Sequence, residues 1–357
     1  MINYRDFLAR VLERALTSEA SDIHFCVGRY PTLRVDGKLT PLEDEKFLDK
    51  NDTEELAYLI LGEENKEKFL QRKELDFSFE YKDRARFRVN TFFQRGVVSS
   101  ALRLIPSKIR TIEELALPRF LHTFARLEQG LVLMTGPAGH GKSTTLAAII
   151  DEINHNRQDH IITIEDPIEY IFTQDKSIID QREVGSDTVS FHRALRSTLR
   201  QDPDVIMVGE MRDYESIAIA LTAAETGHVV FSTLHTNSAS QTIDRIIDIF
   251  PADQQDQVRT QLASTFKGII SQRLLNRRGG GRLPVCEIMT ATPAISNIVR
   301  EKRTHELDMV ISTSSSEGMI SLNSALKNLV LQKEITFEEA LKYSIDPKDL
   351  RLRMKMS

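Results

Sequence analysis

The sequence predicts an α/β protein built around a parallel sheet, with a smaller α+β domain before it. Two observations support this prediction. From residue 131 on, four short apolar runs alternate with stretches of helical periodicity, as in a parallel sheet covered by helices on both faces. Before residue 106, apolar residues instead alternate with polar ones, as they do in half-buried strands. With 357 residues, the chain is long enough for two or three domains.

The composition is that of an ordinary globular protein and excludes several classes. The 47 basic and 52 acidic residues give a net charge of -5, so the chain lacks the positive field of nucleic-acid-binding proteins and we expect no nucleic-acid partner. No apolar run has the length of a membrane span, and the N-terminus is too charged for a signal peptide, which predicts a cytoplasmic protein. Cys26 and Cys286 are isolated, so a CxxC zinc site is excluded.

The N-terminal domain is predicted at residues 1–105. Its elements follow from apolar spacing, which has a period near 3.6 in helices and 2 in strands. They are helices at 4–16 and 52–70, a hairpin turned by Asp36-Gly37, and strands at 77–81, 87–93 and 97–105. Two prolines then bound a charged stretch, which we interpret as a linker over 106–118.

The second domain is predicted at residues 119–290. Its apolar runs are LVLMT (131–135), IITI (161–164), VIMV (205–208) and VVFSTL (229–234). Polar residues follow each run, and strand carboxyl ends form the ligand crevice of an open α/β sheet, so these segments are expected to converge on one site. After the glycine run at 279–281 the pattern is helical to the end of the chain. A helical C-terminal region is assigned to 291–357.

The first apolar run leads into a phosphate-binding loop. The residues GPAGHGKST fit G-x-x-x-x-G-K-[ST] between a strand and a helix. We expect backbone N–H groups to surround the β-phosphate of ATP, Lys142 to bind the β/γ oxygens and Ser143 to ligate Mg²⁺. The nucleotide-binding candidates are Gly136, Pro137, Ala138, Gly139, His140, Gly141, Lys142, Ser143 and Thr144. Two interpretations of His140 stay open, contact with a phosphate or a neighbouring chain and a solvated loop side chain.

Carboxylates and histidines follow the other three runs. Glu165 is a candidate to orient or deprotonate the attacking water, with an ordinary surface acid as the alternative. Glu210 ends its strand as a Walker B acid does, which would place it in the Mg²⁺ shell or beside a water. His228 and His235 flank the fourth run, where γ-phosphate sensing, packing and capping are alternatives; no neighbouring ligands complete a metal site.

Together these motifs resemble the secretion ATPases of type II secretion and type IV pilus systems. The similarity includes the P-loop, IEDPIEY, the QREVG segment, GEMRD and TGHVVFSTLHTNSA. SDIHF (21–25) and ARFRVN (85–90) are similar to the N-terminal domain of the PilT/PilU-type twitching-motility branch. TPAISNIVRE (292–301) is similar to the AIRNLIRE motif of that branch but has lost one arginine. Ala138 and His140 replace the Thr and Ser common in relatives.

The resemblance implies a PAS-like N-terminal domain and a RecA-like P-loop NTPase core, assembled as a homohexamer that hydrolyses ATP. It assigns the catalytic glutamate to Glu165 and the Walker B glutamate to Glu210, and the conserved histidines to His228 and His235. Arg88 and Arg103 correspond to the arginines of the N-terminal domain, which we expect to complete an ATP site held largely by another domain or subunit.

The expected function is a hexameric motor for type IV pilus retraction, docked on a PilC-like platform protein at the inner face of the inner membrane. A second retraction ATPase is a candidate partner. One alternative is a pilus-extension or type II secretion ATPase, although those relatives usually carry extra N-terminal domains and a four-cysteine zinc module. Another is an accessory PilU-like ATPase, because IDPKDLRLRMK resembles the tail of that protein. A RecA-like nucleic-acid motor is opposed by the charge of the chain.

Overall fold

The computed structural model of the chain describes residues 3–35, 37–82, 84–105 and 108–355. The chain divides into two units, one with residues 1–107 and 169–171 and the other with residues 108–168 and 172–357. Asp36 of the predicted turn and Pro106 at the start of the predicted linker lie outside the described residues.

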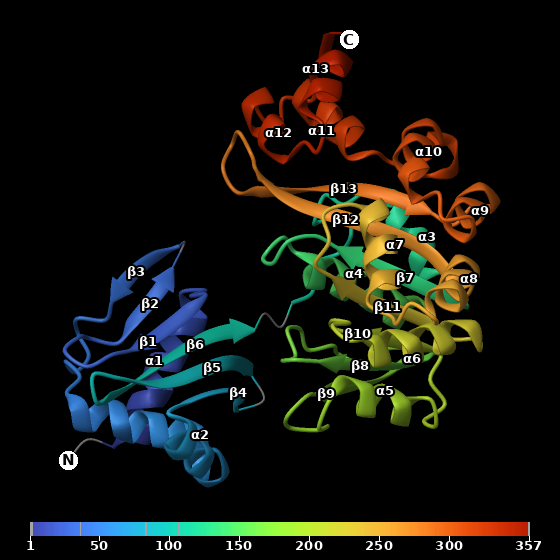
Figure 1. Cartoon of the computed structure of the whole chain (residues 1–357). Helices are drawn as coiled ribbons and strands as arrows, with labels where there is room; N and C mark the ends of the chain where they lie inside the picture. The colour runs from blue at the N-terminus through green and yellow to red at the C-terminus, as the bar shows by residue number, and fades with distance from the viewer. Residues whose placement is uncertain (1–2, 36, 83, 106–107, 356–357) are drawn as a thin grey trace. The chain divides into compact units, whose positions relative to one another are not determined.

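The N-terminal unit is a six-stranded sheet with two helices packed on its hydrophobic face (Figure 1). The strands lie in the order β3-β2-β1-β6-β5-β4, and each neighbouring pair is antiparallel. The elements are α1 (Tyr4–Thr17), β1 (Asp22–Phe25), β2 (Thr32–Val35), β3 (Lys38–Pro41), α2 (Lys50–Arg72), β4 (Glu74–Tyr81), β5 (Ala85–Gln94) and β6 (Val97–Ile105). Of these, β1 had no sequence prediction, because four residues are too few to establish a period.

Side-chain alternation gives this sheet two different faces. Ile23, Val89 and Leu102 are aligned on neighbouring strands and are buried with Leu12 of α1 in one core. The residues beside them in sequence point to the opposite face, because successive strand residues alternate. That opposite face therefore presents the polar residues of the same strands.

The second unit contains a seven-stranded sheet in the order β13-β12-β7-β11-β10-β8-β9. All neighbouring strands are parallel except β13, which pairs antiparallel with β12. The elements up to the end of the sheet are η1 (Arg119–Leu121), α3 (His122–Ala125), β7 (Gly130–Thr135), α4 (Lys142–Asn156), β8 (His160–Glu165), β9 (Ile178–Glu183), α5 (Phe191–Thr198), β10 (Val205–Val208), α6 (Tyr214–Glu225), β11 (Val229–Leu234), α7 (Ala239–Asp248), α8 (Gln255–Thr265), β12 (Phe266–Asn276) and β13 (Arg282–Thr290).

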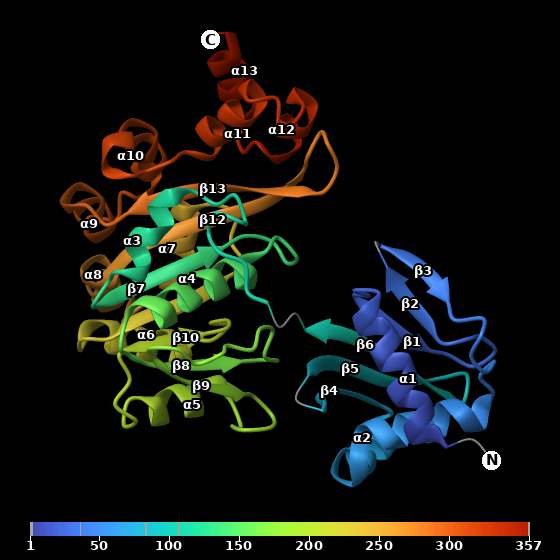
Figure 2. The same ribbon diagram turned by 180° about the vertical axis from the view of Figure 1, so that it is seen from behind.

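Helices cover both faces of this sheet. Seen from the two sides, α4 and α3 lie on one face, and α6 and α7 lie on the other (Figures 1 and 2). Helices α5 to α8 bury their apolar side chains with β7, β10 and β11 in one large core. The strands between these layers are therefore buried on both faces, which explains their continuous apolar runs.

The last helices pack around the β12–β13 hairpin. They are α9 (Pro293–Arg300), η2 (Thr304–Glu306), α10 (Leu307–Thr313), η3 (Ser315–Glu317), α11 (Leu322–Leu331), α12 (Phe337–Tyr343) and α13 (Pro347–Lys355). Leu326 of α11 and Leu350 of α13 share a core with Leu275 and Val285 of the hairpin. Within the part of the chain that is described, none of the helices combines the length and the apolar character that a membrane crossing requires.

Three strands of the second sheet depart from the sequence prediction. The expectation of helix after the glycine run is wrong over residues 282–290, which form β13. Strand β12 was missed because it follows α8 without an intervening turn and carries Lys267 and Arg273 among its apolar residues. Strand β9 was missed because it lies at the sheet edge and is half polar, so it lacks an apolar run.

Candidate nucleotide site

The loop after β7 has the backbone of a phosphate-binding loop. Gly136, Gly139 and Gly141 all have a positive φ, a backbone conformation that residues with a Cβ disfavour. A Cβ on Gly136 would lie 2.3 Å from the backbone oxygen of Gln272, so the loop packs closely on β12. Gly141 is the N-cap of α4 and no side chain caps that helix. The amino end of α4, where the helix dipole favours negative charge, thus lies directly after the loop.

Lys142 lies inside this loop rather than in solvent. Its residue is only 7% exposed, and Nζ donates hydrogen bonds to the carbonyl oxygens of Gly136 (2.8 Å) and Pro137 (3.0 Å). Ser143 and Thr144 follow it in the first turn of α4. The ammonium group is thus positioned by the loop that would surround the phosphates.

The two candidate glutamates leave neighbouring strands. Glu165 ends β8, is 6% exposed, and accepts hydrogen bonds from Thr163 Oγ1 (2.8 Å) and Gln181 Nε2 (3.3 Å). Glu210 follows β10, which pairs with β8. The Gly209 N–H donates to the carbonyl of Ile164 at 2.8 Å, which holds the two strand ends together. Both carboxylates therefore lie at the carboxyl edge of the sheet, where the P-loop also begins.

Glu210 lies beside two basic side chains. Its carboxylate is 2.8 Å from Arg212 Nη2 and 3.4 Å from His235 Nε2. Burial acts to raise the pKa of Glu210, but the hydrogen bond and charge of Arg212, with the charges of His235 and Lys142, hold that pKa below its ordinary value. Glu210 is therefore ionised at neutral pH, and its charge interacts with that of the P-loop lysine.

The structure brings His235 to this edge but not His228. His235 follows the carboxyl end of β11 and contacts Glu210. His228 precedes the amino end of that six-residue strand, which separates the two histidines by about 20 Å. His228 Nδ1 lies 2.9 Å from the carbonyl oxygen of Ala223, at the end of α6. Within a single chain, His235 therefore lies at the carboxyl edge of the sheet and His228 at the opposite edge.

The two arginine candidates lie in the N-terminal unit, on the polar face of its sheet. Arg88 is directly opposite Arg103 on β5 and β6, and Arg103 is directly opposite Asp22 on β1. Arg103 Nε donates to Asp22 Oδ1 at 2.9 Å. Arg88 is exposed and forms no hydrogen bond or ion pair with any residue that the structure describes. Sequence reasoning treated the two arginines alike, and the structure distinguishes them.

Residues of β12 belong to the site although no motif indicated them. Gln272 donates through Nε2 to the carbonyl oxygen of His140 (2.8 Å) and accepts from Thr145 Oγ1 (2.8 Å). Arg273 is buried and donates to the carbonyl oxygens of Gln272 and of Asn237, which follows His235 by two residues. Because β12 was not predicted, the sequence contained no signal that would identify these contacts.

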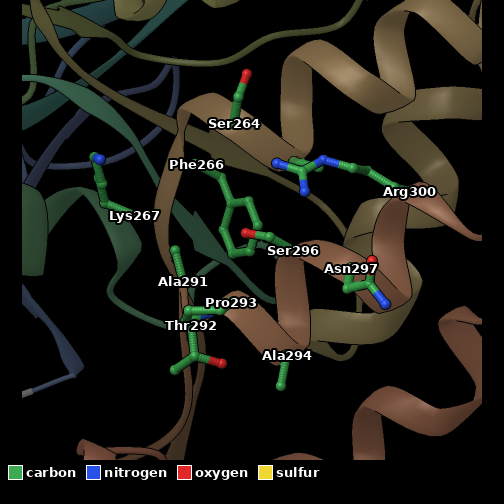
Figure 3. A pocket seen from close by; sticks show the side chains of 11 residues that line it. Ser264, Phe266, Lys267, Ala291, Thr292, Pro293, Ala294, Ser296, Asn297 and Arg300 are labelled. Carbon is green, nitrogen blue, oxygen red and sulfur yellow. The ribbon is translucent and has the colours of Figure 1, made fainter.

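A separate pocket lies at the other edge of the sheet, where β12 begins (Figure 3). Its lining comes from the ends of α8 and β13 and from α9, with Phe266 in the centre and Lys267 and Arg300 among the polar side chains. Most residues of the 292–301 segment line this pocket. The P-loop and the two glutamates do not line it, so this pocket is distinct from the candidate nucleotide site.

The chain has similar sequences and a similar solved structure among known proteins. The family described as type II/IV secretion system protein matches residues 3–279. The chain is 47% identical over 326 residues to the type IV pilus retraction ATPase PilT of Pseudomonas aeruginosa, covering 90% of this chain and 93% of that protein. It is 40% identical over 348 residues to the type IV pilus ATPase PilU of the same organism, covering 97% and 91%. A crystal structure of the pilus retraction motor PilT with bound ADP matches with a TM-score of 0.90 and 48% identity, covering 96% and 98%.

Proposed function

The chain belongs to the type II/IV secretion system protein family, and we propose that it is an ATP-hydrolysing motor that powers type IV pilus retraction. The main support is the carboxyl edge of the second sheet, where the P-loop, two glutamates and His235 lie together. The relative PilT, a pilus retraction ATPase matched over most of its length, favours pilus retraction, and PilU, matched similarly, is also a type IV pilus ATPase.

In this proposal the P-loop holds the phosphates of ATP. The N–H groups of the loop and of the first turn of α4 bind the β-phosphate, and Lys142 exchanges its loop carbonyls for β/γ oxygens. Mg²⁺ arrives with ATP as part of the substrate. No group of three or more His, Cys, Asp or Glu able to hold a metal exists among the described residues. Ser143 and Glu210 are hard oxygen ligands that suit an ion bound mainly through phosphates and water.

The two glutamates differ in their partners and therefore in their proposed roles. Hydrogen bonds from Thr163 and Gln181 orient the Glu165 carboxylate at the end of β8, and we assign to it the general base that accepts a proton from water. Arg212 and His235 keep Glu210 ionised, which suits the Mg²⁺ shell. We assign His235 to sensing the γ-phosphate through its neighbour Glu210. We assign His228 to capping the carboxyl end of α6.

The assembly and its location also remain proposals. We infer a homohexamer that docks on a PilC-like platform protein at the inner face of the inner membrane, with a second retraction ATPase as a candidate partner. We assign a PAS-like domain to 1–105, a linker to 106–118, a RecA-like core to 119–290 and a helical region to 291–357. The antiparallel six-stranded sheet and the mainly parallel seven-stranded sheet are compatible with these two folds.

Deleting the gene tests the direction of pilus movement. If the chain is a retraction motor, pili are still extended but not withdrawn, so we expect surface pili to accumulate and twitching to stop. Re-expression of the unaltered chain should restore twitching, and re-expression of Lys142→Ala should not. Loss of surface pili would instead identify an extension motor.

An accessory role is the second candidate function. The chain aligns with PilU over 348 residues, and the segment that resembles the tail of that protein includes all of α13. An accessory motor predicts that deletion leaves pili retracting as long as the second ATPase is present. Deleting both genes, separately and together, distinguishes the two roles.

We propose that Arg88 is an arginine finger, a side chain that stabilises the charge developing on the phosphate in the transition state. Arg88→Ala is therefore expected to lower kcat by about 10²-fold or more, with a much smaller change in nucleotide affinity. Arg103→Ala is the comparison variant, since Arg103 already pairs with Asp22 and its loss also removes that ion pair. Steady-state hydrolysis and binding of ADP measure the two quantities. A similar fall in affinity and kcat would mean that Arg88 is not a finger.

Mixed rings test whether Arg88 acts across a subunit boundary. Lys142→Ala subunits hydrolyse no ATP but keep Arg88, so they should restore some hydrolysis when assembled with Arg88→Ala subunits. No recovery in rings that assemble normally would indicate that Arg88 acts within its own chain.

A further inference from the structure

Strand β12 extends beyond its neighbour β7. The two strands pair only as far as Ser271 opposite Thr135, whereas β12 continues to Asn276. A backbone N–H on the edge that β7 leaves must find another acceptor, because buried backbone donors are almost always satisfied. The N–H of Leu274 donates to Nδ1 of His140 at 2.9 Å. A P-loop side chain thus takes the position that a strand carbonyl would otherwise occupy.

We propose that His140 is a positioning residue of the P-loop, whose neutral imidazole fastens the loop to β12 and so maintains nucleotide affinity. This inference rests on the proposed nucleotide site and deepens it. The interpretation of His140 as a solvated loop side chain is replaced, since its ring nitrogen and its carbonyl oxygen both bind β12. With Nδ1 as the acceptor, the single proton of the ring is on Nε2.

The same end of β12 supports a C-terminal helix. Asn276 donates its backbone N–H (3.0 Å) and its side-chain Nδ2 (2.9 Å) to Glu339 of α12. Tyr343, the last residue of α12, places its ring edge to face with His140, with the ring centres 6.2 Å apart. The P-loop, β12 and α12 therefore form one continuous set of contacts around His140.

Protonation of His140 would break its hydrogen bond with the Leu274 N–H. It would convert Nδ1 from an acceptor into a donor that faces the Leu274 N–H, so the hydrogen bond would be replaced by repulsion. Burial, followed by the charges of Arg273, Lys142 and Arg282, lowers the pKa of His140, and the Tyr343 ring packs against it from α12. The bond is therefore complete above the ordinary histidine pKa of about 6.5 and is lost as the pH falls through the lowered value.

The test is the affinity of the full-length protein for Mg·ADP between about pH 8 and about pH 5. In His140→Asn, the amide oxygen can replace Nδ1 as the acceptor and does not titrate, whereas His140→Ala has no acceptor. At the higher pH we expect the wild type and His140→Asn to bind alike and His140→Ala to bind about tenfold more weakly. At the lower pH the wild type should weaken relative to His140→Asn, toward the level of His140→Ala.

His305→Asn is the matched control, because it makes the same change at a histidine whose side chain is 78% exposed. It should follow the wild type at every pH. Equal pH profiles for the wild type and His140→Asn, or wild-type affinity in His140→Ala, would overturn the inference and leave the nucleotide site in place. Absence of nucleotide binding by the wild type at all pH values would overturn the proposed function instead. If His140→Ala does not fold, the ratio of wild type to His140→Asn still decides.

Discussion

Lys142→Ala is expected to lower ATP hydrolysis by about 10³-fold or more and to weaken nucleotide binding. The substitution removes a buried ammonium that the loop already orients through two carbonyl oxygens. It therefore takes away both the charge that pairs with the β/γ-phosphates and their hydrogen-bond donor. Steady-state hydrolysis and ADP binding by the purified variant are the measurements.

Lys142→Gln separates charge from loop structure. Its amide can still donate to the carbonyl oxygens of Gly136 and Pro137 but has no charge for a phosphate. We expect this variant to lose hydrolysis as Lys142→Ala does, while its thermal stability stays closer to the wild type. Near-normal turnover in either variant would contradict the assignment of the P-loop.

Glu165→Gln is expected to lower kcat by about 10²-fold or more while nucleotide affinity changes little, because an amide cannot accept the proton of the attacking water. The amide oxygen can still accept from Thr163 and Gln181, so the packing of this buried position is largely kept. Single-turnover hydrolysis and ADP affinity, measured on the same preparation, separate the chemical step from binding.

Glu210→Gln is the companion variant. It removes the negative charge between Arg212 and His235, so we expect a higher Mg²⁺ concentration for half-maximal hydrolysis. If Glu210→Gln binds nucleotide normally and is inactive at all Mg²⁺ concentrations while Glu165→Gln is active, the roles of the two glutamates are exchanged.

The parts of the site that depend on local sequence were predictable. The P-loop is one contiguous segment whose glycines, lysine and hydroxyl are fixed by spacing, and the carboxyl ends of parallel neighbours necessarily share an edge. Glu165, Glu210 and His235 were therefore identified from the residues that follow each strand. The N-terminal helices and most of its strands were predictable for a similar reason, because their periods persist over many residues.

The parts that depend on long-range pairing were not predictable. The hydrogen bonds of His140 require β12, whose pairing with β7 spans more than a hundred residues of sequence. The different environments of Arg88 and Arg103 depend on a register that brings Asp22 opposite only one of them. His228 and His235 belong to one sequence motif, but the strand between them places them at opposite edges of the sheet.

Arg88 and Arg103 lie directly opposite each other on two strands. This placement makes the stability of the N-terminal unit and the activity of the protein conflicting requirements. Like charges in directly opposed positions weaken a sheet, and Asp22 offsets only one of these two. The charge of Arg88, which no described residue neutralises, therefore lowers the free energy of unfolding of the N-terminal unit. A variant selected only for heat resistance would tend to discard Arg88, and with it the group we expect turnover to need most from this unit.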